Sequence, residues 1–176
     1  MDIYFLRHAS AGEPKLIPSK DDERELDKLG IQQSHNVGRL LAAMELKLDA
    51  ILTSPLPRAS ATARIVAEEI GHDQKVLVQA ALEPGGSYEQ FLSLLGRYKS
   101  GDAVMVVGHN PNLTEFLNRL LIGDDAPDAI ELKKAAIAKV EKNGSFAVLK
   151  WCLPPKLVRA VQQVSASNSR PKTVSK

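Results

Sequence analysis

Short apolar runs alternate with amphipathic segments along most of the chain. Three mostly apolar runs, at 3–6, 50–53 and 104–107, predict strands, and the continuous apolar run at 104–107 is typical of a central strand covered on both faces. Apolar residues three and four apart predict helices over 31–46, 57–70, 88–98 and 111–121, and a further short strand is predicted over 75–79. Strand and helix in alternation predict a three-layer α/β/α sandwich with a mostly parallel central sheet.

The last part of the chain has a different pattern. Residues 135–140 and 145–153 predict two more strands, and Lys142-Asn143-Gly144 between them is a hairpin signal. We therefore expect an antiparallel edge on the sheet. A short helical segment is predicted to run to about Val164, followed by a polar tail without apolar periodicity. The sequence thus predicts a single domain over 1–164 and a disordered tail over 165–176.

Proline positions suggest where two of the helices begin. Leu56 precedes Pro57 and is therefore disfavoured in the α region, whereas Pro57 itself suits the first helical position. This arrangement places Arg58 in the first turn of its helix. Asn110 and Pro111 predict a second helix start, with the asparagine as cap and the proline as opening residue.

Basic residues follow the ends of the predicted central strands. Arg7 and His8 come directly after the first apolar run, and His109 follows the run at 104–107. A buried strand stops packing where it becomes charged, so these residues should lie at the carboxyl edge of the sheet, where open α/β sheets bind ligands. Right-handed crossovers bring that edge and the helix carrying Arg58 together. We therefore expect one anion pocket between His8 and His109.

Composition narrows the class of protein. The chain has 176 residues, 44% hydrophobic and 25% charged, which is typical of one globular domain with a full core. A net charge of +2 is too small to indicate a nucleic-acid or membrane partner. One cysteine rules out an internal disulfide, and no apolar run has the length of a signal peptide or a membrane span. We expect a cytoplasmic protein, whose oligomeric state the sequence leaves open.

Two arginines and two histidines beside a helix N-terminus suit a doubly charged oxyanion. Arginine presents a planar fork of donors that matches phosphate, and helix N-termini add aligned N–H groups. The sequence has neither a P-loop lysine motif nor an acidic metal cluster, which argues against magnesium-assisted nucleotide hydrolysis. A neutral histidine can attack phosphorus itself, while arginines neutralise the charge of the transition state.

Each of these residues also has a simpler interpretation. Taken alone, His8 is more typical of a strand-end histidine bonded to backbone, and an arginine usually forms a surface ion pair. The matching contexts of Arg7, Arg58 and His109 favour the site. Arg24 either lines the pocket mouth or belongs to a solvated charge run, and Ser54 is either a capping residue or a ligand group. Lys133 and Lys134 either attract phosphorylated partners or discourage aggregation at an edge.

Three segments together resemble the histidine phosphatase superfamily, also called phosphoglycerate-mutase-like. Arg7-His8-Ala9 is similar to its Arg-His-Gly signature, and residues 54–63 resemble its Ser-Pro-x-x-Arg-Ala-x-x-Thr-Ala segment. Gly108-His109-Asn110-Pro111 resembles the segment of its second histidine. The compact length and three further segments resemble the SixA-type phosphohistidine phosphatases: 24–30, 82–86 and 132–138.

This resemblance implies a phosphoglycerate-mutase-like fold and a two-step phosphatase. His8 would become phosphorylated, Arg7, Arg58 and His109 would bind the transferred phosphoryl group, and water would release phosphate from His8. No metal or organic cofactor is implied. The implied partner is a protein bearing phosphohistidine. A phosphatase of a small phosphate ester and a non-catalytic phosphate-binding module remain as alternatives.

Two positions differ from the pattern of the superfamily. Ala9 stands where glycine is usual, so a turn that needed a positive φ would be strained here. Many members use a carboxylate to protonate the leaving oxygen, and Glu83 is the candidate that the loops offer. A phosphoramidate leaving group can carry its own proton, so phosphohistidine hydrolysis does not require this residue.

Overall fold

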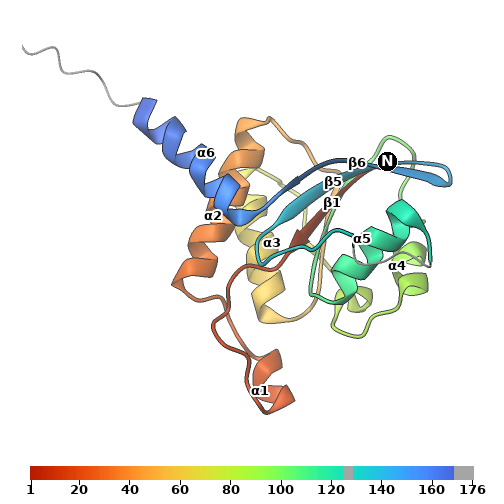
Figure 1. Ribbon diagram of the computed structural model, residues 1–176, viewed down its shortest axis with the longest axis horizontal. Helices are drawn as coiled ribbons and strands as arrows, with labels where there is room; N and C mark the ends of the chain where they lie inside the picture. Colours follow the sequence, from red (N-terminus) through yellow and green to blue (C-terminus); the bar gives the residue numbers. More distant parts are fainter. Residues whose placement is uncertain (125–128, 169–176) are drawn as a thin grey trace, which may run out of the picture.

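A mixed six-stranded sheet forms the centre of the protein in a computed structural model that describes residues 1–124 and 129–168 (Figure 1). Its strands are β1 (Asp2–Arg7), β2 (Ala50–Thr53), β3 (Leu77–Val78), β4 (Ala103–Gly108), β5 (Ile137–Asn143) and β6 (Phe146–Leu153). Their order is β3-β2-β4-β1-β5-β6. The first four are parallel, whereas β5 pairs antiparallel with both β1 and β6. The predicted fold class and its antiparallel edge are confirmed.

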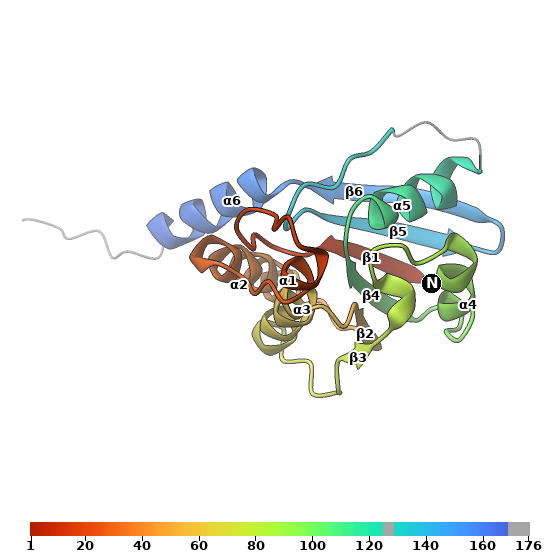
Figure 2. The ribbon, with the colours of Figure 1, turned by 90° about the horizontal axis from the view of Figure 1, so that it is seen from below.

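Helices cover both faces of this sheet. They are α1 (Pro18–Asp22), α2 (Lys28–Ala43), α3 (Pro57–Glu69), α4 (Tyr88–Leu95), α5 (Asn112–Ile122) and α6 (Pro155–Asn168), with a 3₁₀ turn, η1, at Ala80–Leu82. Figure 2 shows α2, α3 and α6 on one side of the sheet and α4 and α5 on the other. Alternate residues of β1 enter the two cores: Phe5 packs with Phe91 on one side, and Leu6 belongs to the cluster of Val37 on the other. In the part of the chain that is described, no helix is long and apolar enough to cross a membrane.

Two helix starts differ from the sequence prediction. Helix α2 begins three residues earlier than predicted, because the Asp27 carboxylate caps it by accepting from the amide of Gly30 at 2.7 Å. Asn110 does not cap α5, which begins at Asn112. The side-chain nitrogen of Asn110 instead donates to the carbonyl of Leu132 at 2.9 Å, and its side-chain oxygen accepts from the hydroxyl of Thr114 at 3.0 Å. Asn110 therefore joins the first turn of α5 to the loop at Leu132 without capping the backbone of the helix.

Other boundaries were predicted too long or missed. The edge strand β3 is two residues long and pairs only with β2, instead of filling 75–79. Helix α4 ends at Leu95 rather than 98, and α1 lies in a segment predicted as a loop. Helix α6 continues to Asn168, so residues 165–168 are helical and not part of a disordered tail. The rest of that predicted tail, 169–176, lies outside the described residues.

The sheet order brings the ends of β2, β4 and β1 together. Arg7 at the end of β1 stands opposite Gly108 at the end of β4. The chain leaves both strands in the same direction, and the amide of His8 donates to the carbonyl of Gly108 at 3.0 Å. On the other side of β4, the amide of Ser54 donates to the carbonyl of Val107 at 3.0 Å. The residues that follow these three strands therefore meet at one edge.

Candidate active site

His8 and His109 face one another at this edge. Their ring centroids are 4.9 Å apart and their planes are tilted by 47°. Both rings are almost fully buried, with exposed fractions of 5% and 3%. They extend from adjacent parallel strands, so strand pairing fixes the position of their backbones. The predicted convergence of the two histidines is confirmed.

A hydrogen bond sets the tautomer of His8. Its Nδ1 lies 2.7 Å from the carbonyl oxygen of Ala9, which can only accept, so Nδ1 carries the proton and Nε2 presents a lone pair. Burial lowers the pKa of His8 to about 3. The hydrogen bond to Ala9 acts in the opposite direction, whereas the positive charges of Arg58 and Arg7 lower the pKa further. The ring is therefore neutral at neutral pH, with Nε2 available as a nucleophile.

His109 is held from the other side by a serine. Its Nε2 lies 2.9 Å from the hydroxyl oxygen of Ser54, while its Nδ1 is buried with no hydrogen-bond partner. Burial lowers the pKa of His109 to about 2, and the electrostatic interactions with His8, then Arg58 and Arg7, lower it further. When the Ser54 hydroxyl donates to Nε2, the ring proton lies on Nδ1 and can be donated to a ligand oxygen.

Arg58, which is buried, and Arg7, which is half-buried, bring two guanidinium groups to the same edge. Arg58, in the first turn of α3, is 4% exposed, and its Nη1 donates to the carbonyl of Asp21 at 2.8 Å. The Nη1 of Arg7 donates to the carbonyl of Leu132 at 2.9 Å. Burial lowers the pKa of both groups below the ordinary value for arginine, yet an arginine stays charged at neutral pH. The site is thus positively charged.

Three nitrogens of this site are buried without a partner. They are Nε of Arg7, Nε of Arg58 and Nδ1 of His109, and the described residues contain only one other such side-chain atom, in His72. A buried unsatisfied donor costs about 1–3 kcal/mol, so three such groups at one place indicate that a ligand with acceptor atoms binds here. Helices α3 and α5 also begin at this edge and direct the positive ends of their dipoles toward it. A tetrahedral oxyanion such as a phosphoryl group satisfies these requirements.

The turn after His8 is fixed by hydrogen bonding to α3. The amide of Ala9 donates to the hydroxyl of Thr62 at 3.1 Å, and that hydroxyl donates to the carbonyl of Arg58 at 2.7 Å. Ala9 is fully buried and is not among the residues with positive φ in the described chain. The turn does not need a positive φ, so alanine in place of glycine causes no backbone strain here.

Arg24 braces the loop over the site. Its Nε and Nη2 lie 2.8 and 3.1 Å from the two carboxylate oxygens of Asp21, and its Nη1 donates to the carbonyl of Ala11 at 3.0 Å. Asp21 in turn touches Arg58, and its own pKa is lowered to about 2, mainly by the hydrogen bond from Arg24. The side chain of Arg24 is 11% exposed, so it does not belong to a solvated run. A direct role of Arg24 in substrate binding stays a prediction.

Glu83 lies in the loop after η1, beside the end of β4. A Cβ added to Gly108 would lie 3.2 Å from the carbonyl oxygen of Leu82, so this loop packs directly on the strand that precedes His109. Glu83 is partly buried, and its carboxylate has no hydrogen bond or ion pair among the described residues. Its role as a proton donor stays a prediction.

Sequence reasoning did not assign the supporting side chains. Thr62 had a sequence signal, because it lies four residues after Arg58 and so on the same face of α3. Ser54 contacts His109 from 55 positions away, a pairing that only the sheet order reveals. The described residues include no group of three or more histidine, cysteine or acidic side chains placed to hold a metal ion. The expected independence from cofactors stays a prediction.

A family model for the histidine phosphatase superfamily (branch 1) matches residues 3–83. This match includes His8 and Arg58. An uncharacterized protein of Picosynechococcus sp. is 36% identical over 140 residues, which cover 78% of this chain and 82% of that protein. The chain belongs to the histidine phosphatase superfamily. Its membership confirms the resemblance seen in the three sequence segments.

Solved structures of histidine phosphatases share the fold of this chain. The protein histidine phosphatase SixA complexed with tungstate superposes with a TM-score of 0.77 at 23% identity, covering 89% of this chain and 98% of that one. A putative alpha-ribazole-5'-P phosphatase from Escherichia coli superposes with a TM-score of 0.68 at 18% identity, with the same coverage of 89% and 98%. The two neighbours act on different substrates by name, so the likeness shows the fold of this chain and not its substrate.

Proposed function

We propose that this protein is a phosphatase that removes the phosphoryl group from phosphohistidine in proteins through a covalent intermediate on His8. The observation that carries the proposal is the hydrogen bond from His8 Nδ1 to the Ala9 carbonyl. It leaves a neutral, unprotonated Nε2 between two arginines, where a phosphoryl group would bind.

The reaction consists of two displacements at phosphorus. In the first, the Nε2 lone pair of His8 forms a bond to phosphorus, and the bond from phosphorus to the substrate imidazole breaks with its electron pair. In the second, a water oxygen attacks the phosphorus on His8, the N–P bond breaks, and His8 recovers its lone pair as phosphate and a proton leave. The guanidinium groups of Arg7 and Arg58 and the Nδ1–H of His109 would stabilise the charge on the phosphoryl oxygens in both steps.

Two observations support phosphohistidine as the substrate. The segments 24–30, 82–86 and 132–138 resemble SixA-type phosphatases. The carboxylate of Glu83 has no contact with a member of the site among the described hydrogen bonds and ion pairs. A phosphohistidine substrate is compatible with such a site, because its departing imidazole can carry a proton of its own. An alkyl phosphate ester, in contrast, leaves as a basic oxygen and gains from a positioned acid.

Hydrolysis of a small phosphate ester is the second candidate function. The likeness in fold to a putative alpha-ribazole-5'-P phosphatase favours it. A non-catalytic phosphate-binding module is less well supported, since binding alone requires the arginines but not a neutral imidazole with a free lone pair.

The test is hydrolysis of p-nitrophenyl phosphate and of a phosphohistidine protein by wild type and by His8→Ala. We expect the wild type to hydrolyse both substrates and the variant to lose at least about a thousandfold in kcat with each. Wild type should also accumulate an acid-labile phosphate on His8. His35→Ala is the matched control, because His35 pairs with Glu69 at 2.7 Å between α2 and α3, outside the site.

The other outcomes select between the alternatives. Turnover of p-nitrophenyl phosphate without turnover of the phosphohistidine protein would favour the ester phosphatase. Phosphate binding without turnover of either substrate would favour the binding module. Equal hydrolysis by wild type and His8→Ala would rule out His8 as the nucleophile.

A further inference from the structure

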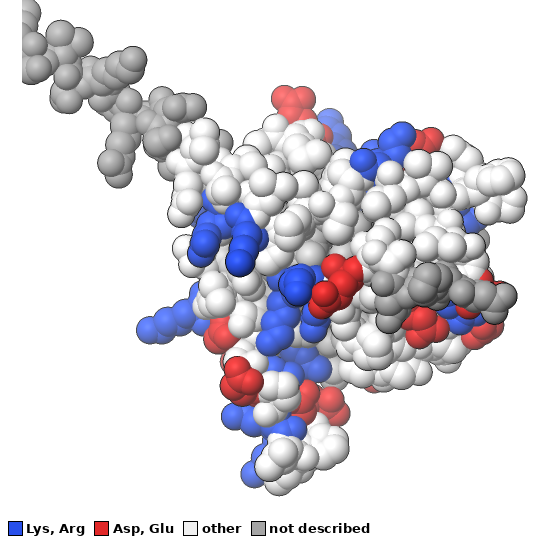
Figure 3. All heavy atoms as spheres, in the orientation of Figure 1, with Lys and Arg blue, Asp and Glu red and all other residues white. Residues whose placement is uncertain are grey.

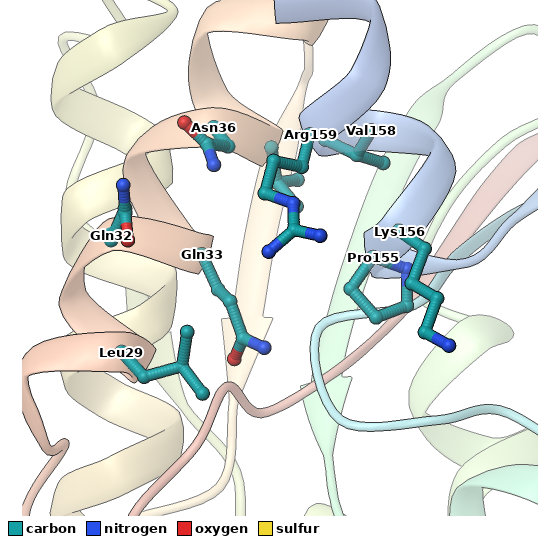
Figure 4. A pocket seen from close by; sticks show the side chains of 9 residues that line it. Leu29, Gln32, Gln33, Asn36, Pro155, Lys156, Val158 and Arg159 are labelled. Atoms are coloured by element: carbon teal, nitrogen blue, oxygen red, sulfur yellow. The ribbon is translucent and has the colours of Figure 1, made fainter. Parts of the chain in front are cut away.

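A cavity of about 240 Å³ lies between α2 and α6 (Figure 4). It forms where α6 leaves the body of the protein: Val158, 1% exposed, packs in the same core cluster as Val37 of α2, whereas the next turns of α6 extend outward (Figure 1). Its volume is below the 300–1,000 Å³ typical of cofactor and drug-sized sites, so it suits a side chain better than a whole small molecule.

The cavity has an apolar wall with positive charges at its opening. Leu29 of α2 is 52% exposed although it lines the cavity, and Pro155 and Val158 line it from α6. Figure 4 shows the guanidinium of Arg159 extending from α6 into the space between the two helices, and Lys156 extending from α6 beside Pro155. Such a combination of an exposed apolar surface and cations is suited to an apolar side chain flanked by carboxylates.

The positive charges of Lys156 and Arg159 are not neutralised by neighbouring carboxylates in the described part of the chain. Among the described residues, neither forms an ion pair with a carboxylate. Lysine and arginine side chains also gather beside α6 and over the carboxyl ends of the central strands on the same face (Figure 3). The chain's own last residues, 169–176, contain Arg170, Lys172 and Lys176 and no acidic residue, so their charge has the same sign as that of the opening. Charge complementarity therefore points to an acidic partner.

The cavity is connected to the turn that carries the nucleophile. Gln33 lines the cavity, and its side-chain oxygen accepts from the amide of Ser10 at 2.9 Å, two residues after His8. Gly30, one turn earlier on α2, packs so closely on the same residue that an added Cβ would lie 1.9 Å from the Ser10 carbonyl oxygen. A chain segment seated between α2 and α6 thus lies just across the first turns of α2 from His8.

We propose that the cavity between α2 and α6, with Lys156 and Arg159 at its opening, binds an acidic segment of the phosphoprotein substrate and takes up one apolar side chain of that segment. This inference rests on the proposed function, since it requires the substrate to be a protein. Binding there holds the substrate chain beside the His8 turn and lowers its KM without taking part in the chemistry.

The test uses two synthetic phosphohistidine peptides. One carries glutamates and a leucine beside the phosphohistidine, and the other carries serine in each of those positions. For wild type we expect the acidic peptide to have a KM about tenfold lower. The double variant Lys156→Glu, Arg159→Glu should abolish this preference, and Leu29→Ser should reduce it. Added salt should weaken the preference of wild type.

Arg97→Glu, Lys99→Glu is the matched control. It makes the same change in net charge at exposed positions between α4 and β4, where the chain enters the sheet at the edge away from the histidines. This control should keep the preference of wild type. An equal KM for the two peptides with wild type, or an unchanged preference in Lys156→Glu, Arg159→Glu, would overturn the proposal.

A binding measurement separates this proposal from the proposed function. Fluorescein-labelled, unphosphorylated forms of the two peptides are titrated with wild type and followed by fluorescence polarisation. Tighter binding of the acidic form, lost in Lys156→Glu, Arg159→Glu, supports the cavity as a docking site even if phosphohistidine is not hydrolysed. Equal binding of both forms would overturn it, as would a dimer in sedimentation that only these two substitutions dissociate, because the occupant would then be a second copy of the chain.

Discussion

The hydroxyl oxygen of Ser54 lies 2.9 Å from Nε2 of His109, and this contact joins the chain after β2 to the chain after β4. The same hydroxyl accepts from the amide of Leu56 at 3.3 Å, in the turn that leads into α3 and Arg58. One serine thus links the orientation of the second histidine to the turn that carries the buried arginine. A hydroxyl that donates to Nε2 places the ring proton on Nδ1, which has no partner in the protein.

Ser54→Ala should therefore impair catalysis more than folding. Loss of the hydroxyl frees the ring of His109 to rotate and to change tautomer, and we expect kcat for p-nitrophenyl phosphate to fall about tenfold. Ser54→Thr, which keeps the hydroxyl, should recover most of the activity. Ser60→Ala is the control, because it removes a hydrogen bond to the Ser54 carbonyl without touching His109. Equal kcat in Ser54→Ala and wild type would exclude a positioning role.

Arg58→Ala should lower kcat by about a hundredfold or more, as loss of a transition-state donor typically does. The residue is buried in the first turn of α3 and one of its donors has no protein partner. Arg64→Ala, an exposed arginine on the same helix, serves as the control for general effects on α3. Steady-state kinetics with p-nitrophenyl phosphate measure both. Unchanged kinetics in Arg58→Ala would place the guanidinium outside the reacting site.

Acidification should destabilise the protein through the two buried histidines. The pKa of His8 is lowered to about 3 and that of His109 to about 2, whereas the unperturbed value is 6.5. Below 6.5 the unfolded chain binds more protons than the folded chain, so the free energy of unfolding falls as the pH drops. We expect up to about 1.4 kcal/mol per pH unit for each ring in urea unfolding from neutral pH to about pH 5.

The double variant His8→Asn, His109→Asn provides the comparison for this prediction. Asparagine does not titrate, so the pH dependence of its unfolding free energy should be shallower than that of wild type over the same interval. A slope as steep as that of wild type would mean that other groups cause the acid sensitivity.

Glu83→Gln distinguishes the kind of leaving group that the site serves. If Glu83 donates a proton, the variant should lose about a hundredfold in kcat/KM with an alkyl phosphate such as phosphoserine. Hydrolysis of phosphohistidine should change by less than about threefold, because its leaving group can carry its own proton. Glu89→Gln, an exposed carboxylate on α4, is the control. Equal losses with both substrates would contradict this division.

Chelation should leave the activity intact. The proposed mechanism uses only imidazole and guanidinium groups, so extended treatment with EDTA should not change kcat for p-nitrophenyl phosphate. A sample treated with EDTA and then supplied with magnesium or zinc gives the necessary comparison. Loss of activity with EDTA and its return with one of these metals would contradict the cofactor-free mechanism.

The parts predicted well from sequence are those governed by local rules. The Leu56-Pro57 pair predicted the start of α3 correctly, because proline restricts the backbone on both sides of its nitrogen. The strand ends predicted the meeting of His8 and His109, because parallel strands joined by helices leave one edge together. These constraints act over a few residues or through simple topology, so one sequence contains them.

The parts predicted poorly depend on distant contacts. Asparagine often caps helices, but the side-chain amide of Asn110 donates instead to the carbonyl of Leu132, which lies in the loop before β5. The length of β3 depends on β2 alone, because an edge strand has one neighbour. Gln33 looks in the sequence like any other polar residue of a helix, yet its side-chain oxygen accepts a hydrogen bond from the amide of Ser10. Side chains that bind loops to helices give no periodic signal.

The order of the strands also decides how the site responds to partial unfolding. Strands β1 and β4, which lead to the two histidines, are the innermost pair, and each has a hydrogen-bonded neighbour on its other side. Opening of the outer hairpin or fraying of β3 would leave this pair intact, so we expect its amide protons to exchange with solvent only when the whole domain unfolds. We therefore expect the distance between the two imidazoles to be protected by the global stability of the protein.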